Sequence, residues 1–261
     1  IFFLIYMNQG ITKIPLTVDK LFDAPSKINF LQDDVIISVN GIPLEGDLDE
    51  LSDELRRALS DDLATYVVKR DGKLISFENI NQNPPRIFQV LPKSAAISAG
   101  LETGDVILSI NSEQIKTFNQ IKKIVETSNG EPLTVEYWRK GAVYFTNLKP
   151  TIVDVPMREG GFERIYRIGV VGGLFPFDPV TSRQSFGQAF FASINSIYSI
   201  MEGSVKGLYH ILFGNISSCN LSGPISIAET SGQMVKQGGL DYLWFIAVLS
   251  TAIGMINLFP I

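Results

Sequence analysis

Two stretches of the chain repeat the same order of hydrophobic and polar positions. The sequence DVIISVN at 34–40 returns as DVILSIN at 105–111, and the stretch at 65–72 returns, with a similar pattern, at 134–141. Each copy reads as an apolar strand, a turn, an amphipathic helix, a second strand and a hairpin turn. The repeat therefore predicts two copies of one small domain that contains both helix and strand.

An amphipathic helix is predicted in each copy. In the first copy, leucines three or four positions apart form one apolar face, at Leu48, Leu51, Leu55 and Leu59. In the second copy the apolar face consists of Phe118, Ile121, Ile124 and Val125. Thr117 and Gln120 form a capping-box pattern, in which two side chains satisfy backbone N–H groups at the helix start.

The pattern changes in the last third of the chain. Apolar residues recur in steps of three and four over 186–212, which predicts a helix at the membrane interface or against other membrane helices. Residues 242–261 carry no charge and are long enough, at about 1.5 Å per residue, to cross a hydrocarbon layer of ~30 Å. We predict a transmembrane helix there. The apolar run at 1–7 reads as the end of another helix, so we expect a fragment of a longer protein.

Composition separates the same two regions. Of the 49 charged residues in the chain, 44 lie within 11–183, and the last third is therefore membrane-like. A net charge of -5 argues against a nucleic-acid partner, because phosphate contacts need clustered lysine and arginine. One cysteine permits no disulfide within the chain, and one histidine cannot form a zinc site by itself. We therefore expect no complete metal site in this chain.

Residues 90–111 closely resemble the core of a bacterial PDZ domain, with VLPKSAA followed by AGLETGDVILSIN. Gly100 and Gly104 suit the positive φ angles of tight turns, and Asp105 can accept hydrogen bonds from turn amides. The first copy has KINF at 27–30 in place of the Ala-Gly-Leu turn, so it resembles a degenerate PDZ domain.

The fold class that follows is α+β, with two small PDZ-like domains in tandem, each a partly open β-barrel or sandwich. An amphipathic helical connector and a transmembrane helix come after them. We place the boundaries at 1–10 for the end of a membrane helix, 11–82 and 83–156 for the PDZ-like domains, 157–239 for the connector and 240–261 for the membrane helix.

PDZ domains bind extended peptides by adding a strand to a sheet edge beside a helix. In the second copy we expect that edge at Arg86, Ile87 and Phe88, opposite the helix at 118–127. The preceding prolines offer no N–H groups for a carboxylate. The alternative is that both domains form a steric wall over something in the membrane.

Two further strings, NLSGPISIA at 220–228 and GMINLFPI at 254–261, point to a family. Together with the tandem PDZ-like domains, they resemble the site-2 protease family of intramembrane zinc metalloproteases, in particular the bacterial regulator-of-sigma-E protease branch. The resemblance covers essentially the whole chain. It implies a multi-pass enzyme of the bacterial inner membrane, with its PDZ domains on the periplasmic side as a substrate size filter. Such an enzyme cleaves single-span membrane proteins after an earlier cleavage has trimmed them.

The resemblance also implies where the chemistry lies. The family holds zinc with a His-Glu-x-x-His motif and a Leu-Asp-Gly motif, and neither is present, so we expect this chain alone to be inactive. Asn257 matches a family residue that holds the substrate main chain, a role that suits a carboxamide because it both donates and accepts. Asn257 can also cap the helix ahead of Pro260, and the two roles can coexist.

The expected partners are membrane lipid and single-span membrane protein substrates, with no nucleic acid. The alternative from another class is a non-catalytic, membrane-tethered PDZ scaffold, which the composition and the repeat also allow. The two strings at 220–228 and 254–261 favour the protease, because a scaffold has no evident physical need for them.

Overall fold

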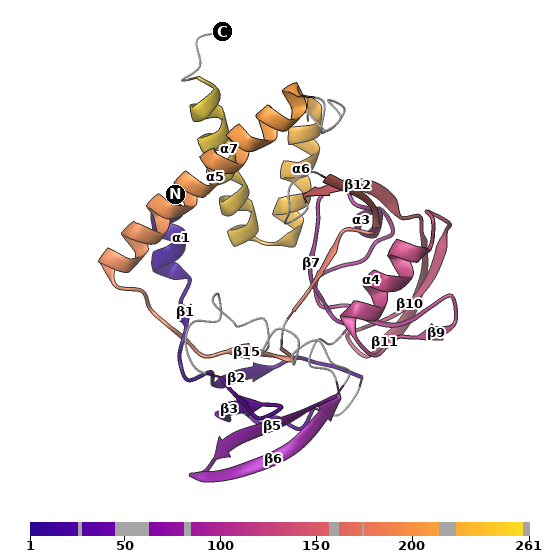
Figure 1. The fold of residues 1–261 in the computed structure, drawn as a ribbon, viewed down its shortest axis with the longest axis vertical. Coiled ribbons are helices and arrows are strands. Elements are labelled where there is room, and N and C mark those ends of the chain that lie inside the picture. The colour runs from indigo at the N-terminus through magenta and orange to yellow at the C-terminus, as the bar shows by residue number, and fades with distance from the viewer. Residues whose placement is uncertain are drawn as a thin grey trace. The chain divides into compact units, whose positions relative to one another are not determined.

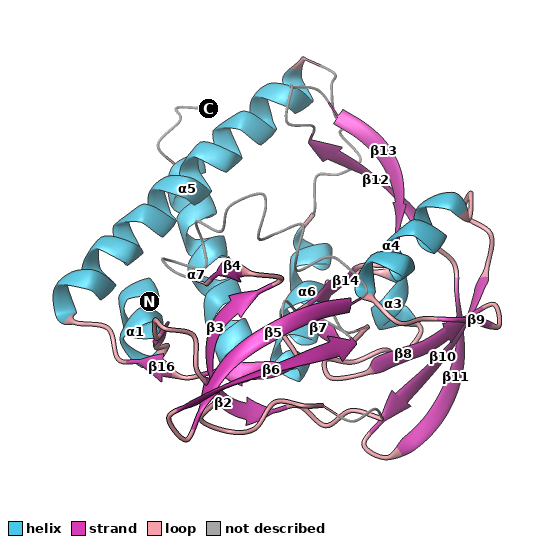
Figure 2. Ribbon diagram, turned by 60° about the horizontal axis from the view of Figure 1, so that its bottom comes forward, coloured by secondary structure: helices cyan, strands magenta, loops and turns pink. Residues whose placement is uncertain are grey.

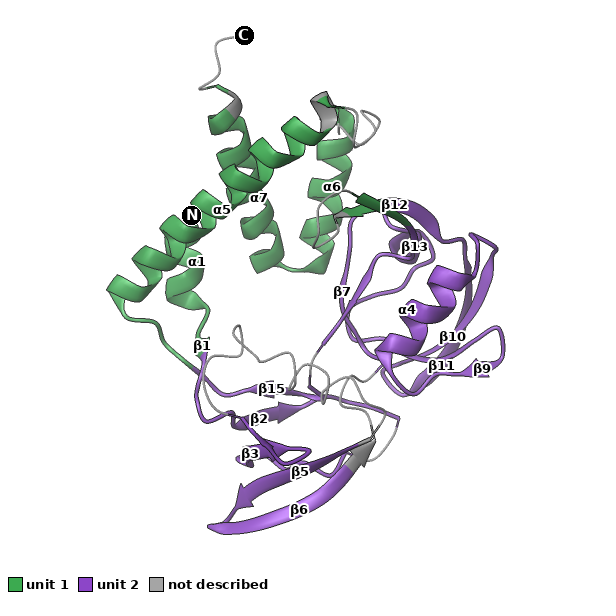
Figure 3. Ribbon diagram, in the orientation of Figure 1, with its two compact units in different colours: residues 1–11, 154–164, 182–261 green, residues 12–153, 165–181 purple. Residues whose placement is uncertain are grey.

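The fold is mixed α+β in a computed structural model, which confirms the predicted class. The structure describes residues 1–25, 28–44, 63–80, 85–156, 162–173, 175–213 and 223–257. The chain divides into two compact units (Figure 3). The first unit is residues 1–11, 154–164 and 182–261, and the second is residues 12–153 and 165–181.

The first unit is mainly helical (Figure 1). Its helices are α1 Phe2–Asn8, α5 Phe186–Leu212, α6 Pro224–Gln237 and α7 Gly239–Ile256. The short helix α1 packs against both α5 and α7. The hydroxyls of Tyr6 and Ser196 lie 2.6 Å apart, and the rings of Phe2 and Trp244 meet edge to face with centroids 5.0 Å apart.

Helix α5 covers the residues predicted from the apolar periodicity, but most of its apolar stripe is exposed, although Phe186 meets Phe3 of α1 edge to face with ring centroids 5.0 Å apart. The buried positions of its first half are the small residues Ala189 and Ser193, which let another helix approach closely. The large apolar residues are exposed by 39–70%, at Phe186, Phe190, Ile194, Ile197, Val205 and Leu208.

The transmembrane helix at 242–261 stays a prediction. Helix α7 begins before that stretch and ends at Ile256, and residues 258–261 lie outside the described part of the chain. Within the described residues, no helix has both the length and the apolar content that a membrane crossing requires.

The second unit consists of two lobes. The first lobe, residues 12–80 and 175–181, contains β2 Val18–Leu21, β3 Val35–Val39, β4 Ile42–Pro43, β5 Leu63–Arg70, β6 Lys73–Ile80 and β15 Phe177–Pro179. The second lobe, residues 85–153 and 165–172, contains β7 Ile87–Val90, α3 Ala95–Ser98, β8 Val106–Ile110, β9 Glu113–Gln114, α4 Phe118–Thr127, β10 Leu133–Arg139, β11 Ala142–Leu148 and β14 Val170–Gly172.

Matching sheets in the two lobes show that the sequence repeat is a structural repeat. The four-stranded sheets have the orders β4-β3-β5-β6 and β9-β8-β10-β11 (Figure 2). A two-stranded sheet accompanies each of them, β2 with β15 and β7 with β14. The capping box at Thr117 and Gln120 is present at the start of α4. The helix predicted at 48–59 in the first copy lies outside the described residues.

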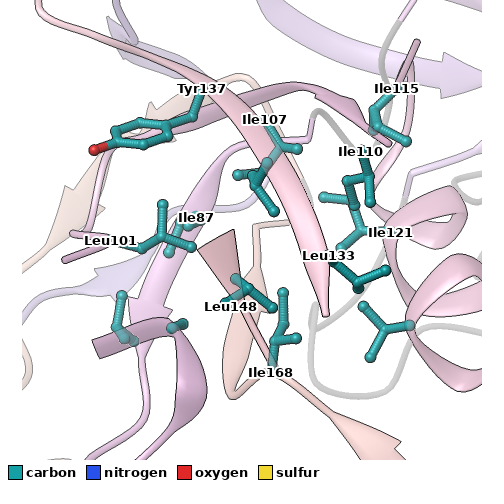
Figure 4. Packing of buried hydrophobic residues seen from close by; sticks show 14 residues of the cluster. Ile87, Leu101, Ile107, Ile110, Ile115, Ile121, Leu133, Tyr137, Leu148 and Ile168 are labelled. Atoms are coloured by element: carbon teal, nitrogen blue, oxygen red, sulfur yellow. The ribbon is translucent and has the colours of Figure 1, made fainter. Parts of the chain in front are cut away.

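Each lobe has its own hydrophobic core. In the first lobe the core is built around Phe30, Tyr66 and Phe177. In the second lobe, apolar side chains from β7, β8, α4 and β10 converge with Leu148 and Ile168 (Figure 4). Residue Ile168 belongs to the stretch that the sequence analysis placed in the connector.

That stretch, residues 165–181, completes both lobes. Strand β14 pairs antiparallel with β7 in the second lobe, and β15 then pairs antiparallel with β2 in the first lobe. The second lobe is therefore inserted in the sequence between strands of the first lobe. The boundaries placed at 11–82 and 83–156 leave one strand of each lobe outside.

The remaining short strands form two further pairs. Strand β1, Ile11–Thr12, pairs with β16, Thr181–Ser182, and β12, Thr151–Pro156, pairs with β13, Phe162–Arg167. The backbone N–H of Lys13 also donates to the carbonyl of Val180, at 2.8 Å. The two ends of the lobed region, near 12 and 181, are thus held side by side.

Candidate functional site

Strand β14 occupies the edge at which the sequence analysis placed a bound peptide. Val170 stands opposite Val90, and Gly172 stands opposite Ile87. On its other side, Ile87 donates its N–H to the carbonyl of Asp105 at 2.7 Å and accepts from Gly104 at 2.8 Å. The predicted groove between 86–89 and α4 is therefore corrected, because β7 already has chain neighbours on both sides.

The three residues predicted to bind a peptide have different environments. The side chain of Ile87 is fully buried in the core of the second lobe. Arg86 is half-buried, with its guanidinium carbon 3.8 Å from the centre of the Phe22 ring. Phe88 is 54% exposed. A substrate-binding role for the three stays a prediction, and Phe88 presents the most open side chain of them.

A glycine places the start of β14 against α3. Gly169 has φ +79°, and a Cβ at this position would clash with the side chain of Ser94. The carbonyl of Gly169 accepts from the N–H of Leu91, and the carbonyl of Ile168 accepts from the N–H of Ala96, both at 2.8 Å. Ser94 also caps α3, since its Oγ accepts from the N–H of Ile97. This local packing holds β14 in register with β7.

Helix α4 lies close to β14 and to the residues just before it. A Cβ on Gly172 would lie 2.5 Å from the ring of Phe118, so α4 begins directly against the strand. Just before the strand, Nη2 of Arg167 lies 4.0 Å from a carboxylate oxygen of Glu126 on α4. Among the strands that the structure describes, β14 pairs with β7 alone. Phe118 of α4 thus lies against the end of β14, and Glu126 of α4 lies near Arg167, the residue that starts the approach to the strand.

Arg167 and β14 were missed by the sequence analysis. The signal was present in the sequence IYRIGVV at 165–171, where apolar residues flank a glycine as they do in a short strand that starts at a tight turn. This segment follows the second copy of the repeat and has no counterpart between the copies, so periodicity alone did not connect it to either lobe.

Asn257 lies at the C-cap of α7. Its backbone has φ -67° and ψ -15°, its N–H donates to the carbonyl of Ile253 at 3.1 Å, and its side chain is exposed. The predicted position at the helix end is confirmed. Contact with a substrate stays a prediction.

The described residues do not provide a zinc site. They contain no group of three or more His, Cys, Asp and Glu side chains that could hold a metal ion. His210 instead packs edge to face against Phe162, with ring centroids 4.9 Å apart. Cys219 lies outside the described residues.

Comparison with known proteins places the chain in a family. Residues 1–261 match the profile of Peptidase family M50. The chain belongs to Peptidase family M50. The predicted resemblance to the site-2 protease family is thereby confirmed.

Similar M50 relatives carry protease names. The putative zinc metalloprotease BH06270 of Bartonella henselae is 30% identical over 68% of this chain and 52% of its own length. The regulator of sigma-E protease RseP of Salmonella typhimurium is 31% identical over 69% of this chain and 40% of its own. The putative zinc metalloprotease R01501 of Rhizobium meliloti is 33% identical over 68% and 47%. The chain thus spans about half the length of these relatives.

Solved structures are also similar to part of this M50 chain, and one of them is a PDZ domain. It is the PDZ domain of an SdrC-like protein from Listeria monocytogenes, at 17% sequence identity and a TM-score of 0.29. The match covers 36% of this chain and 92% of that domain.

Proposed function

We propose that the longer protein containing this chain is an intramembrane zinc endopeptidase that cleaves single-span membrane proteins. The match of all 261 residues to Peptidase family M50 carries this proposal. The zinc ion is expected to bind outside the described residues, and this chain would supply Asn257 beside the scissile peptide. A non-catalytic scaffold is the alternative, and a longer protein that binds no zinc would favour it.

Membrane association is the second part of the proposal. Helix α5 exposes six large apolar side chains on one stripe, while its buried positions are the small residues Ala189 and Ser193. An amphipathic helix with an exposed apolar stripe gains free energy by lying in the boundary between lipid headgroups and acyl chains. We propose the bacterial inner membrane as its location, with the two lobes on the periplasmic side.

The two lobes are proposed to act as a size filter. Both β7 and β2 are already paired with strands of the same chain, so a filter made from these lobes needs no bound peptide for its integrity. A folded domain still attached to the substrate would clash with the lobes, and steric exclusion gives selectivity without tight binding. Trimmed substrates would pass.

The filter is tested by excising the lobes from the longer protein. Because β1 pairs with β16, residues 13–180, which also include the segment 154–164 of the first unit, can be replaced by a short glycine linker that joins neighbouring strands. We expect the excised enzyme to cleave untrimmed substrates while still cleaving trimmed ones, both measured by gel assay. Continued rejection of untrimmed substrates would contradict the size-filter role, and bound zinc serves as the control for folding.

Substrate contact at Asn257 needs a separate test in the longer protein. Loss of one positioned hydrogen-bonding group typically slows an enzyme by about 100-fold or more, and we expect this for Asn257→Ala with zinc content unchanged. Asn195→Ala, at an exposed asparagine on α5, is the matched control. Cleavage by Asn257→Ala at the parent rate would leave Asn257 with the capping role alone.

A further inference from the structure

The contact between Arg86 and Phe22 connects the two lobes of the second unit. Arg86 directly precedes β7 of the second lobe, and Phe22 directly follows β2 of the first lobe. The guanidinium carbon lies 3.8 Å from the centre of the Phe22 ring. This is the distance of a planar cation stacked on an aromatic face.

The base of the Arg86 side chain is held firmly in the second lobe. Arg86 forms a β-bridge with Val106, and its neighbour Ile87 is fully buried and hydrogen-bonded to Asp105. Gly104 lies beside the guanidinium, where an added Cβ would be 3.6 Å from Nη2. Because the backbone on both sides is paired, the reach of the side chain toward Phe22 follows from the position of β7.

The charges around the guanidinium come from the first lobe. Asp23 follows Phe22, and Asp178 lies on β15, opposite Lys20 of β2. Burial lowers the pKa of Arg86, and the carboxylates of Asp178 and Asp23 oppose this shift. The half-buried guanidinium is thus stacked on one ring of the first lobe, and the negative charge of the same lobe favours its charged form.

We propose that Arg86 is an interlobe pin that holds the two lobes in one arrangement through its stack on Phe22. The role of Arg86 as a pin depends only on the contact between Arg86 and Phe22. Its consequence for substrates rests on the proposed size filter, because a fixed arrangement of the lobes sets the space left for a substrate. Arg86 is then a positioning residue rather than part of a peptide-binding edge.

The pin is tested by measuring the distance between the lobes in the full chain. Spin labels are placed at Leu74→Cys on β6 and Asn147→Cys on β11, both exposed, in a Cys219→Ser background. We expect a narrow distance distribution that broadens in Arg86→Ala, because a cation–aromatic contact shifts a conformational equilibrium by about 3- to 30-fold. Arg86→Lys keeps the charge but loses the planar stack, so it should broaden less.

One variant is a control for the distance measurement, and a second variant tests the contact from the Phe22 side. Lys140→Ala removes an exposed cation at the hairpin tip of the second lobe and should leave the distribution narrow. Phe22→Leu keeps an apolar side chain but removes the ring, and it should broaden the distribution from the other side of the contact. An unchanged narrow distribution in both Arg86→Ala and Phe22→Leu would overturn the pin.

The consequence for substrates is measured with Phe22→Leu in the longer protein. We expect a several-fold gain in cleavage of untrimmed substrates and unchanged cleavage of trimmed ones. Broadened distances without this gain would retain the pin and contradict the size filter. A gain without broadened distances would retain the filter and overturn the pin, so the two proposals fail separately.

Discussion

The two lobes share one buried ion pair in equivalent positions. Asp34 accepts from the N–H of Leu31 at 2.8 Å and from Nε of Arg70 at 2.7 Å. Asp105 accepts in the same way from Glu102 and from Arg139, at 2.8 and 2.6 Å. This confirms the turn-amide role predicted for Asp105. Both carboxylates are fully buried, and a buried charge without partners is costly, which explains why both copies have the complete set.

The lobes differ in the segment that directly precedes the buried aspartate, Asp34 in the first lobe and Asp105 in the second. The second lobe uses α3 and a turn in which Gly100 has φ +78° and Leu101 is buried. In the first lobe Phe30 fills the core instead, edge to face with Tyr66 and Phe177 at centroid distances of 4.8 and 5.1 Å. The turn motif can therefore be lost when an aromatic side chain supplies equivalent buried volume, whereas the ion pair is kept.

The largest expected difference between the lobes is in independent folding. A fragment of residues 12–80 lacks Phe177, which is 2% exposed in the core of the first lobe, so we expect no cooperative thermal unfolding. A fragment of residues 85–173 contains its closing strand β14 and should unfold cooperatively. Adding residues 175–181 to the first fragment through a flexible linker should restore folding. A cooperative transition in 12–80 alone would show that β15 is dispensable.

The shared ion pair offers a comparison of intermediate size. Asp34→Ala and Asp105→Ala each leave a partly buried arginine without its main partner and should lower the free energy of unfolding by about 3–5 kcal/mol. We expect the smaller loss for Asp105→Ala, because Arg139 also lies 3.2 Å from Glu102. Urea denaturation measures both losses.

The control for these two variants is an exposed ion pair. Lys122 and Glu126 lie 3.9 Å apart on the surface of α4, and Lys122→Ala should cost about 0.5 kcal/mol or less. An equal loss in Asp34→Ala and Lys122→Ala would mean that burial does not decide the value of the shared pair.

The smallest expected difference in stability comes from the turn that follows β3 in the first lobe and β8 in the second lobe. Gly41 in the first lobe has φ +79°, and Ser112 in the same position of the second lobe has φ +67°. Ser112→Gly should therefore stabilise the second lobe by about 1 kcal/mol, and Gly41→Ser should destabilise the first lobe by a similar amount. Thermal unfolding would detect both shifts. Ser76→Gly, within strand β6, should destabilise, and a gain there would refute the conformational explanation.

Local patterns in the sequence were enough to predict the repeat, the hairpin turns, the capping box and the helix at 186–212. These features depend on neighbouring residues, whose side-chain periodicity and turn preferences act over a few positions. The family was identified from the two strings at 220–228 and 254–261 together with the repeat, and these are also local features of the sequence. Asn257 was expected to cap the helix ahead of Pro260, and α7 has its C-cap at Asn257.

Only the tertiary structure decided how the two lobes are closed. Strands β14 and β15 pair with β7 and β2, far away in the sequence, because those strands have edges whose backbone groups need partners. Because β14 pairs with β7, the strand edge that could accept a peptide belongs to β14 and not to Arg86, Ile87 and Phe88. The exposed stripe of α5 was also decided at this level, since its buried positions are the small residues Ala189 and Ser193. Periodicity identifies a helix face, but the shape of the neighbouring helix selects which face is buried.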